Sequence, residues 1–414
     1  MKQRYDSYKP SGIDWIGDIP SHWTLSKIKF IGEIRGRIGF RGYTTADLVS
    51  EGEGALTIGG KHISNNVIDL TDPEYISWDK YYESPEIMVS KGDIVIAQRG
   101  TLKRTAYISK NIGPATINPS LVLLTNIKIN PKYLHSYLCS NAMTEFIDYL
   151  NTATAVPMIS QNQIENIRII EPPLAEQEAI AAWLDEKCGE IDAAIAKVDR
   201  EIELIDELKQ SEISRVVTRG LNPDASLRSS GIDWIGDIPK QWKINKLKYH
   251  SDIFSGEGLP MIYQTDDPEI PVYGGGGILG YSKVANNLGN TLILGRVGGD
   301  GTVRHINNKF WATDNALIIN TTLNKTFLCC ILNRANLIKL NTSTAQPLLT
   351  ATKIKNVEIP VPPLSEQQAI ADYLDAKCAE IDRLKGKLTK KRETLTELRQ
   401  SIISEVVTGK RKVI

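Results

Sequence analysis

Two short strings contain residues that could bind a nucleotide, but each lacks the context its chemistry requires. Gly275-x-Gly277-x-x-Gly280 fits a dinucleotide-binding fingerprint, yet no helical pattern follows Tyr281, and the fingerprint needs a strand, a tight turn and a helix. Gly59-Gly60-Lys61 suggests a phosphate loop, but the leading glycine would fall on Ala55 and the hydroxyl position is His62. We therefore expect no nucleotide cofactor in this chain.

Residues suited to group transfer or metal binding are scattered. Asn118-Pro119-Ser120-Leu121 shares only its first two letters with the Asn/Asp-Pro-Pro-Tyr/Phe motif of amino-methyltransferases. No pair of cysteines has metal-ligand spacing, and no acid or cysteine clusters around a histidine. The sequence predicts no catalytic residue and no metal site. The residues concerned are His22, His62, His135, His250, His305, Cys139, Cys188, Cys329, Cys330 and Cys378.

The chain repeats itself, and the repeat defines the elements that position everything else. Residues 11–20 (Ser-Gly-Ile-Asp-Trp-Ile-Gly-Asp-Ile-Pro) return unchanged as residues 230–239. A Pro-Pro-Leu-x-Glu-Gln phrase that opens a long helical stretch at Pro172 returns at Pro362. The order of motif, globular part and helix therefore occurs twice, which indicates two half-molecules in tandem. Such pseudo-symmetry suits a partner with two half-sites, and double-stranded DNA is the commonest one.

The two globular parts share an order of elements but differ in their loops. Residues 92–99 and 289–296 each form an apolar strand pattern that ends in arginine, and strand and short helical patterns follow both. We expect residues 56–64 and 271–277 to have no counterpart in each other. The sequence predicts an α+β protein with two α/β domains on one scaffold. Different loops suit two readers of different half-sites, and drift after duplication would also produce them.

Both long helices carry an apolar stripe at alternating steps of four and three residues, the spacing of a coiled-coil seam. Residues 171–219 carry six basic and thirteen acidic side chains, whereas residues 362–414 carry eleven basic and eight acidic ones. We therefore predict antiparallel pairing of a helix over residues 174–219 with the second helix. The alternative is two separate helices, each packed on its own globular part. The predicted pairing residues are Leu184, Ile191, Ile195, Val198, Ile202, Leu374, Ile381, Leu384, Leu388 and Leu395.

Bulk composition indicates a globular, cytoplasmic protein. The chain has 414 residues, of which 41% are hydrophobic, and a formal net charge of zero. That length predicts two to four domains. No run of 18 apolar residues and no secretory signal pattern are present, so we expect neither a membrane span nor secretion. Zero net charge does not by itself indicate nucleic-acid binding.

Taken together, these motifs resemble the specificity subunit of Type I restriction-modification systems. The resemblance rests on the doubled Asp-Trp-Ile-Gly-Asp-Ile-Pro, the doubled helix entries, and the run from Pro271 through Gly295-Arg296-Val297-Gly298 to residues 310–315. It implies two target recognition domains in tandem, held apart by two long antiparallel helices in a circular repeat. The implied parts are recognition domain 1 (1–171), spacer helix 1 (172–219), a linker (220–229), recognition domain 2 (230–361) and spacer helix 2 (362–414).

The resemblance also implies partners. The chain would read a bipartite target on double-stranded DNA, dock two methylation subunits, and join restriction subunits in the full complex. It implies no catalysis by the chain itself. S-adenosylmethionine, ATP and Mg²⁺ would bind to the partner subunits, and the target adenine would be flipped into a methylation subunit.

We expect the DNA contacts to come from loop residues, because Arg and Lys bind phosphates and guanine. Arg99 and Arg296 end equivalent strands, so a structural salt bridge is an alternative role for both. Tyr273 has packing in a turn as its alternative. For the four tryptophans that recur with the repeated motif, core packing is favoured over base stacking; they are Trp15, Trp23, Trp234 and Trp242. The predicted DNA-binding residues are Lys61, His62, Arg99, Lys103, Arg104, Tyr273, Lys283, Arg296, Arg304 and His305.

Other functions stay open at this point. One is the specificity subunit of a related methyltransferase or nuclease system. Another is a single-chain enzyme that combines recognition with methylation or cleavage, which the missing cofactor motifs disfavour. A third is a coiled-coil adaptor that binds only proteins, which would leave two differently looped domains of one fold unexplained.

Overall fold

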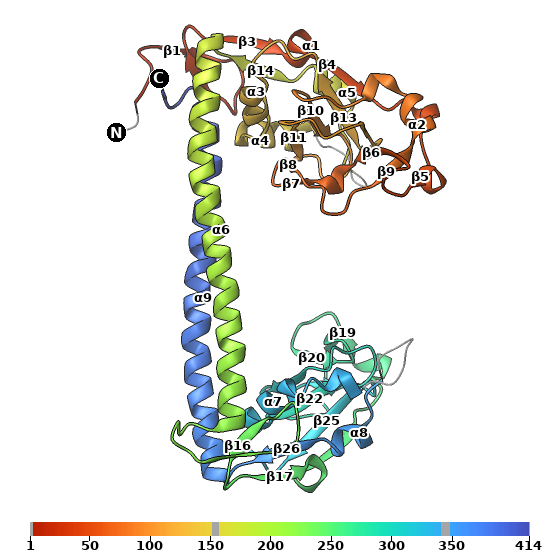
Figure 1. Ribbon diagram of the computed structural model, residues 1–414, viewed down its shortest axis with the longest axis vertical. Helices are drawn as coiled ribbons and strands as arrows, with labels where there is room; N and C mark the ends of the chain where they lie inside the picture. The colour runs from red at the N-terminus through yellow and green to blue at the C-terminus, as the bar shows by residue number, and fades with distance from the viewer. Residues whose placement is uncertain (1–2, 151–156, 341–347, 414) are drawn as a thin grey trace. The chain divides into compact units, whose positions relative to one another are not determined.

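The computed structural model describes residues 3–150, 157–340 and 348–413 (Figure 1). They form two compact units: unit 1 contains residues 1–199 and 390–414, and unit 2 contains residues 200–389. Residues 152–157 (Thr-Ala-Thr-Ala-Val-Pro) and 342–347 (Thr-Ser-Thr-Ala-Gln-Pro) match in sequence, and apart from Pro157 they lie outside the described residues. Within the described ranges, no helix combines the length and apolarity that a membrane crossing requires.

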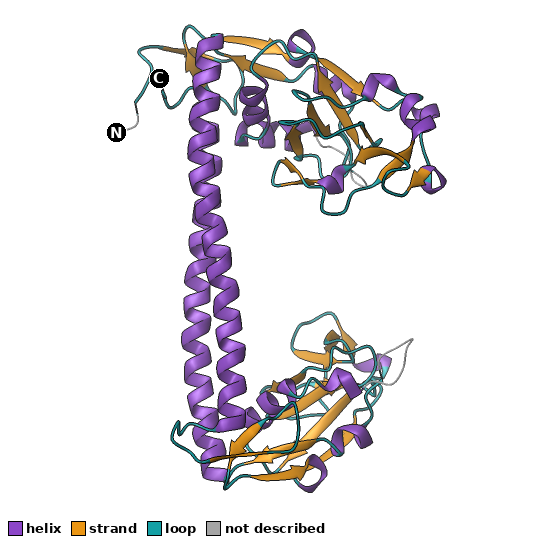
Figure 2. Ribbon diagram, in the orientation of Figure 1, coloured by secondary structure: helices purple, strands orange, loops and turns teal. Residues whose placement is uncertain are grey.

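Unit 1 contains two four-stranded sheets (Figure 2). The two central strands of the larger sheet are short apolar runs with both faces buried, as expected for strands inside a core. In the smaller sheet β12 (Ala115–Ile117) runs parallel to β6 (Gly54–Ile58). In order, the larger sheet has β11 (Thr105–Tyr107), β10 (Ile94–Ala97), β13 (Leu121–Thr125) and β4 (Glu33–Gly36). The smaller has β12 (Ala115–Ile117), β6 (Gly54–Ile58), β9 (Tyr75–Ser77) and β5 (Leu48–Val49).

Unit 2 repeats this topology strand for strand. Its larger sheet has β23 (Val303–Ile306), β22 (Thr291–Gly295), β25 (Ala316–Thr321) and β18 (Ser251–Ser255) in order. Its smaller sheet has β24 (Trp311–Ala312), β20 (Ile270–Tyr273), β21 (Ile278–Ser282) and β19 (Gln264–Thr265), with β24 parallel to β20. Strands β6 and β20 thus hold the same place, so the prediction that residues 56–64 and 271–277 have no counterpart is wrong. Pairing between distant strands, which local patterns do not reveal, creates the equivalence.

Short helices and two-stranded sheets complete each unit. The helices are α1 (Ile28–Ile31), α2 (Trp78–Tyr82), α3 (Pro131–Leu138), α4 (Asn141–Leu150) and α5 (Gln161–Glu165) in unit 1, and α7 (Lys325–Arg334) and α8 (Ala351–Lys355) in unit 2. The paired strands in unit 1 are β1 (Tyr8–Pro10) with β2 (Asp18–Pro20), β3 (Thr24–Lys27) with β14 (Arg168–Glu171), and β7 (Ile63–Ser64) with β8 (Val67–Ile68). In unit 2 they are β15 (Leu227–Ser229) with β16 (Asp237–Pro239), and β17 (Lys243–Lys246) with β26 (Glu358–Val361).

The glutamate of the helix-entry phrase fixes the tryptophan that follows the repeated motif. In unit 1, Glu176 accepts hydrogen bonds from Trp23 Nε1 at 2.9 Å and from Tyr5 Oη at 3.1 Å. In unit 2, Glu366 accepts one from Trp242 Nε1 at 3.0 Å. Both indoles are buried, so each N–H needs such a partner. The duplicated phrase therefore ties each long helix to its own unit, and core packing is confirmed for these two tryptophans.

The adjacent glutamine caps a second element in each unit. Gln177 Oε1 accepts the backbone N–H of Asn130, the N-cap of α3, at 2.9 Å. Gln367 Oε1 accepts the backbone N–H of Asn324, the N-cap of α7, at 2.9 Å. Both glutamines are buried, and their amide nitrogens donate to a proline carbonyl of the same phrase. Glutamate and glutamine thus have separate structural roles.

The long helices are α6 (Leu174–Arg219) and α9 (Leu364–Val407), and α6 covers the predicted range 174–219. In unit 1, Asp192 and Asp199 accept from Arg399 and Arg392 at 2.8 and 2.6 Å. In unit 2, Asp206 and Asp382 accept from Lys385 and Lys209 at 2.7 and 2.6 Å. In both units, residue numbers rise along α6 as they fall along α9. Exposed pairs of this kind add little stability, but they select a register.

The predicted pairing residues differ in burial. Leu184, Ile191, Val198, Leu374 and Ile381 are buried, whereas Ile195, Ile202, Leu388 and Leu395 are half-buried. Leu384 is 49% exposed, so its assignment to the seam is wrong. Seam residues alternate in steps of three and four. The step from 378 to 381 is three, so the next seam residue is four positions further on, at half-buried Lys385, and not at Leu384.

Candidate nucleic-acid interface

The arginines that follow the equivalent strands β10 and β22 are one position out of register, which corrects their alignment in the sequence. Arg99 corresponds to Val297, since these two form the isolated bridges with Met158 and Leu348, and Arg296 corresponds to Gln98, whose carbonyl accepts the N–H of Ile159 at 2.9 Å. Arg99 follows β10 and forms an isolated bridge with Met158. Arg296 follows β22, and its carbonyl accepts the N–H of Leu349 at 2.9 Å. The backbone N–H of Arg99 donates to Ser120 O at 3.2 Å, and that of Arg296 to Asn315 O at 2.8 Å. Each arginine is thus held between a loop and a returning segment, which fixes its backbone and leaves its side chain to the surface.

The two guanidinium groups are weakly engaged. Among the described residues, no hydrogen-bond or ion-pair partner is found for the exposed Arg99 side chain. Arg296 Nη1 makes two long contacts, 3.5 Å to Ser255 Oγ and 3.4 Å to Asp314 O. Neither arginine forms a salt bridge in the described part, so the alternative role as salt-bridge residues gains no support. An arginine without a strong internal partner keeps its donors available for a ligand.

Three glycines let two loops of unit 2 cross in direct contact beside Arg296. A Cβ on Gly275 would lie 1.7 Å from Val297 O, and a Cβ on Gly295 would lie 1.9 Å from Gly275 O. A Cβ on Gly299 would lie 2.6 Å from Gly275 O. The segment after the glycine loop is strand β21 rather than a helix, which confirms that the dinucleotide fingerprint lacks its required context. Here the glycines serve close backbone packing.

We expect Gly275→Ala to destabilise unit 2 strongly. The new methyl group would meet the rigid backbone carbonyl of Val297 and force the loops apart, at a cost of about 3 kcal/mol or more. Gly276→Ala is the matched control, because nothing lies within 4 Å of a Cβ there. Thermal unfolding of the two variants would show a lowered transition for the first only. Equal transitions would contradict the crossing.

Two neighbouring residues predicted to bind DNA in unit 1 have internal partners. His62 is only 2% exposed, its Nδ1 accepts the N–H of Gly59 at 2.9 Å, and its Nε2 lies 3.1 Å from Asp72 O. It therefore supports the loop after β6, and its prediction as a DNA contact is withdrawn. Lys61 stays at the surface, where it pairs with Glu74 and Asp72 at 2.9 and 3.0 Å. Hydrogen bonds to these carboxylates raise the pKa of Lys61.

Lys103 and Arg104 lie in the loop between β10 and β11. Lys103 Nζ pairs with Asp148 at 2.8 Å, an exposed contact that a phosphate could replace at low cost. Arg104 Nη1 donates to Gly60 O at 2.7 Å and connects this loop with the one that carries Lys61. The three cations of this part of unit 1 therefore belong to two adjacent loops.

Of the other predicted DNA-binding residues of unit 2, three have internal side-chain contacts and one, Lys283, has no side-chain contact among the described residues. The ring of Tyr273 packs edge-on against buried Phe310, with centroids 5.6 Å apart, so its placement favours packing. Arg304 and His305 lie in β23, where Arg304 pairs with Asp300 at 3.2 Å and His305 Nε2 lies 2.9 Å from Asn290 Oδ1. Burial lowers the pKa of His305. Lys283 is exposed and has no side-chain partner among the described residues.

In the described ranges the structure places one cysteine beside a histidine: Cys139 Sγ lies 3.5 Å from His135 Nε2, and burial lowers the pKa of His135 to about 4. No group of three or more His, Cys, Asp or Glu residues there is placed to hold a metal ion. Burial raises the pKa of Cys139 and Cys330 to about 12, so neither thiol forms a nucleophilic thiolate near neutral pH. The residues best suited to bind a ligand are therefore surface cations on loops.

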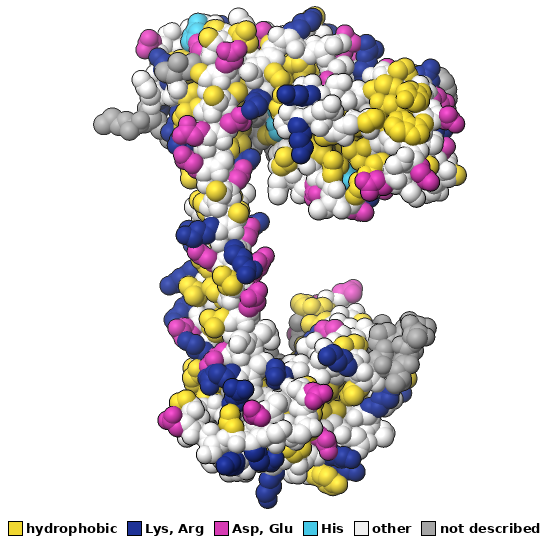
Figure 3. Space-filling model, viewed as in Figure 1, with side chains coloured by type: hydrophobic (Ala, Val, Ile, Leu, Met, Phe, Trp, Pro, Cys, Tyr) yellow, Lys and Arg dark blue, Asp and Glu magenta, His cyan; other side chains and the backbone are white. Residues whose placement is uncertain are grey.

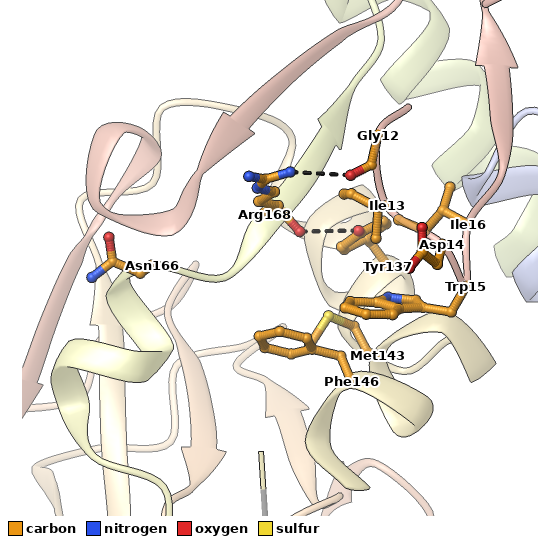
Figure 4. Close-up of a pocket in the computed structure, with 10 residues that line it drawn as sticks. All are labelled: Gly12, Ile13, Asp14, Trp15, Ile16, Tyr137, Met143, Phe146, Asn166 and Arg168. Atoms are coloured by element: carbon orange, nitrogen blue, oxygen red, sulfur yellow. Dashed lines mark hydrogen bonds between the residues drawn. The ribbon is translucent and has the colours of Figure 1, made fainter. Parts of the chain in front are cut away.

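A cavity lies beside the repeated motif of unit 1, and the residues that line it pack against one another (Figure 4). It measures about 200 Å³, and Trp15, Met143 and Phe146 form much of its wall. Arg168 Nη1 donates to Gly12 O at 3.3 Å, and its carbonyl accepts from Tyr137 Oη at 3.1 Å. The ring centroids of Trp15 and Phe146 lie 5.4 Å apart. These contacts support core packing for Trp15.

Comparison with known proteins gives consistent matches. The sequence profile of the type I restriction modification DNA specificity domain matches residues 20–203 and 239–391. The type I restriction enzyme MjaVIII specificity subunit of Methanocaldococcus jannaschii is 24% identical over 366 residues, which cover 79% of this chain and 81% of that protein. A second protein of that archaeon, provisionally assigned as the MjaX specificity subunit, is 24% identical over 424 residues and 96% of each chain.

A solved structure extends the likeness to the fold. It comes from work on the complex assembly and conformational transition of the type I R-M system, and one of its chains matches with a TM-score of 0.70. The match covers 94% of this chain and 98% of that chain at 17% identity. At this identity the likeness shows a common fold.

Proposed function

The chain belongs to the type I restriction modification DNA specificity family, and from this we propose that it is the DNA-specificity subunit of a type I restriction-modification complex. Family membership carries the proposal. DNA and the other components of such a system are accordingly its partners. Support from the molecule itself is the presence of two units with one topology and different surface loops, as two readers of different half-sites require.

We propose that units 1 and 2 are target recognition domains and that α6 and α9 form one antiparallel coiled coil between them. The ion pairs support this, because Asp192, Asp199 and Asp206 recur every seven residues along α6, the heptad spacing. Their partners Arg399, Arg392 and Lys385 also recur every seven residues in the opposite direction. The helices would then set the distance between the two DNA segments that are read.

Recognition by this chain would be separate from catalysis. We propose that two methylation subunits bind S-adenosylmethionine and flip the target adenine, and that restriction subunits bind ATP and Mg²⁺. The chain would position these subunits on the DNA. Its own surface cations would supply part of the phosphate contacts, and the partner subunits would supply the rest.

Within the interface, we propose that the strand-end arginines Arg99 and Arg296 read bases. Their backbones are fixed and their side chains are weakly engaged. Paired cations would contact phosphates after exchanging a carboxylate for a phosphate oxygen. Tyr273 would support its loop. The proposed phosphate-binding residues are Lys61, Lys103, Arg104, Lys283, Arg304 and His305.

Arginine variants of unit 2 test this proposal. We expect Arg296→Ala to weaken binding of the assembled complex to its target duplex by about 1–3 kcal/mol and to leave binding to random duplex nearly unchanged. Arg304→Ala should weaken both and reduce the steepness of the salt dependence. Affinities measured by fluorescence anisotropy at several salt concentrations would distinguish the two outcomes.

Lys387→Ala, on the exposed surface of α9, is the control for a general loss of positive charge. Equal losses for Arg296→Ala on target and random duplex would show that Arg296 contacts the backbone. No loss for Arg296→Ala on either duplex would remove this arginine from the interface.

A further inference from the structure

A short lysine-rich turn with an exposed aromatic ring occurs at the same place in both units. It follows β3 in unit 1 as Lys27-Ile28-Lys29-Phe30 and β17 in unit 2 as Lys246-Leu247-Lys248-Tyr249. Ile28 and Leu247 are fully buried, so each turn is anchored through its second residue. Phe30 is 61% exposed and Tyr249 is 70% exposed. The anchoring holds each ring in solvent.

In each turn the lysine that precedes the ring lies against it, and the lysines of both turns lack acidic partners in the described ranges. Lys29 Nζ lies 5.4 Å from the centroid of Phe30, and Lys248 Nζ lies 5.2 Å from that of Tyr249. Lys27 and Lys29 both donate to Asn166 Oδ1, at 3.4 and 3.1 Å. In the described part of the chain, none of the four lysines of the two turns pairs with a carboxylate. We call these turns, residues 27–30 and 246–249, the Lys-aromatic surfaces.

The surfaces lie on constant elements rather than on the recognition loops. Strand β3 pairs with β14, which leads into α6, and β17 pairs with β26, which leads into α9. Within unit 1, Figure 1 shows β3 and α1 at the edge opposite β7 and β8. Lys and Arg side chains also gather along the edge of unit 2 that carries β17 (Figure 3). A contact made here would not depend on the bases that each unit reads.

Retention of both surfaces is informative because the loops around them diverged. Drift would not keep an exposed ring next to two lysines in each unit, since an exposed ring adds nothing to the core. Aromatic residues gain binding energy when a partner buries them. The backbone of a DNA duplex is anionic and offers no apolar pocket for a ring. A protein surface with a pocket rimmed by carboxylates fits both the ring and the lysines.

We propose that the two Lys-aromatic surfaces are equivalent docking points for two copies of one partner protein, each presenting an acidic-rimmed apolar pocket. The proposal rests on the proposed function, under which that partner is the methylation subunit. Each unit would then bind one copy in the same way, whatever DNA sequence its loops read.

Binding of the purified methylation subunit to ring variants of the full chain tests the proposal. We expect Phe30→Ser or Tyr249→Ser to weaken binding of one copy about tenfold or more, and the double variant to weaken binding of both. Light scattering coupled to size exclusion would show the change from two bound copies to one and then to none. Tyr82→Ser is the matched control, because Tyr82 is 64% exposed but lies in α2, away from the surfaces.

Each result has a distinct meaning. A double variant that binds two copies as tightly as the wild type would overturn the docking surfaces while the proposed function stands. A wild-type chain that binds no methylation subunit would overturn the proposed function and the surfaces with it. If the double variant binds the methylation subunit normally but loses affinity for all duplexes equally, the surfaces contact DNA. That result would overturn the proposal that they bind a protein. A photo-crosslinking residue at position 30 or 249, but not 82, should trap the subunit.

Discussion

Exchanging residues 21–171 for the equivalent segment of another family member is expected to replace one half of the recognised sequence and to leave the other half unchanged. Unit 1 has its own sheets, and its larger core includes side chains of the constant elements, among them Ile180, Leu184 and Val406, which an incoming segment must also fit. The incoming segment must supply a tryptophan for Glu176 and an N-cap residue for Gln177, as Trp23 and Asn130 do here. With those partners kept, the foreign loops would present new base contacts on an unchanged frame.

Mapping of methylated adenines in cells that carry the hybrid would read out both half-sites at once. The reciprocal exchange, residues 240–361 of unit 2, is the control and should alter the other half only. A hybrid that changes both half-sites would show that the units do not read independently. An inactive hybrid that lacks the partners of Glu176 and Gln177, alongside an active hybrid that has them, would confirm the role of these contacts.

Matched insertions of four residues in α6 and α9 are expected to lengthen the unread spacer by one or two base pairs and to leave both half-sites unchanged. Placing them after Asp199 and before Arg392 keeps every observed ion pair within its unit. Four residues add about 6 Å of helix and rotate the downstream part by only some 40°. DNA rises about 3.4 Å per base pair. If the coiled coil sets the distance between the segments that are read, that distance must grow.

An insertion in α6 alone is the control for this prediction. It would shift Asp206 and Lys209 against Lys385 and Asp382, so register and activity should suffer. Genome-wide methylation maps of the two strains would separate the outcomes. An unchanged spacer with full activity in the matched variant would show that the helices do not fix the distance.

The long helices could be predicted closely because their signals are local. The proline pair at the entry, the heptad stripe and Gly220 at the exit together give the bounds of α6, observed as Leu174–Arg219. The apolar strands before Arg99 and Arg296 could also be predicted, because a run of apolar residues is a local signal. Duplication identified Glu176 and Gln177 as special, although only the structure shows that they bind Trp23 and Asn130.

Features that depend on distant pairing could not be predicted. The equivalence of β6 and β20 arises from parallel pairing with β12 and β24, strands far away in the sequence. His62 looked like a loop residue, but Gly59 and Asp72 enclose its ring. Leu384 is apolar and was assigned to the stripe, but it lies one residue before the seam position and is exposed to solvent. The exposure of Phe30 and Tyr249 likewise follows from anchoring by a buried neighbour.

Methyl transfer to random-sequence duplex, measured for the chain alone, the methylation subunit alone and their mixture, tests the central claim most directly. Labelled S-adenosylmethionine would report the transfer, and sequencing of the methylated duplexes would report the target. We predict transfer only in the mixture, confined to one bipartite sequence whose halves change when unit 1 or unit 2 is exchanged. Transfer by the chain alone, or equal transfer to all sequences in the mixture, would contradict its role as a specificity subunit.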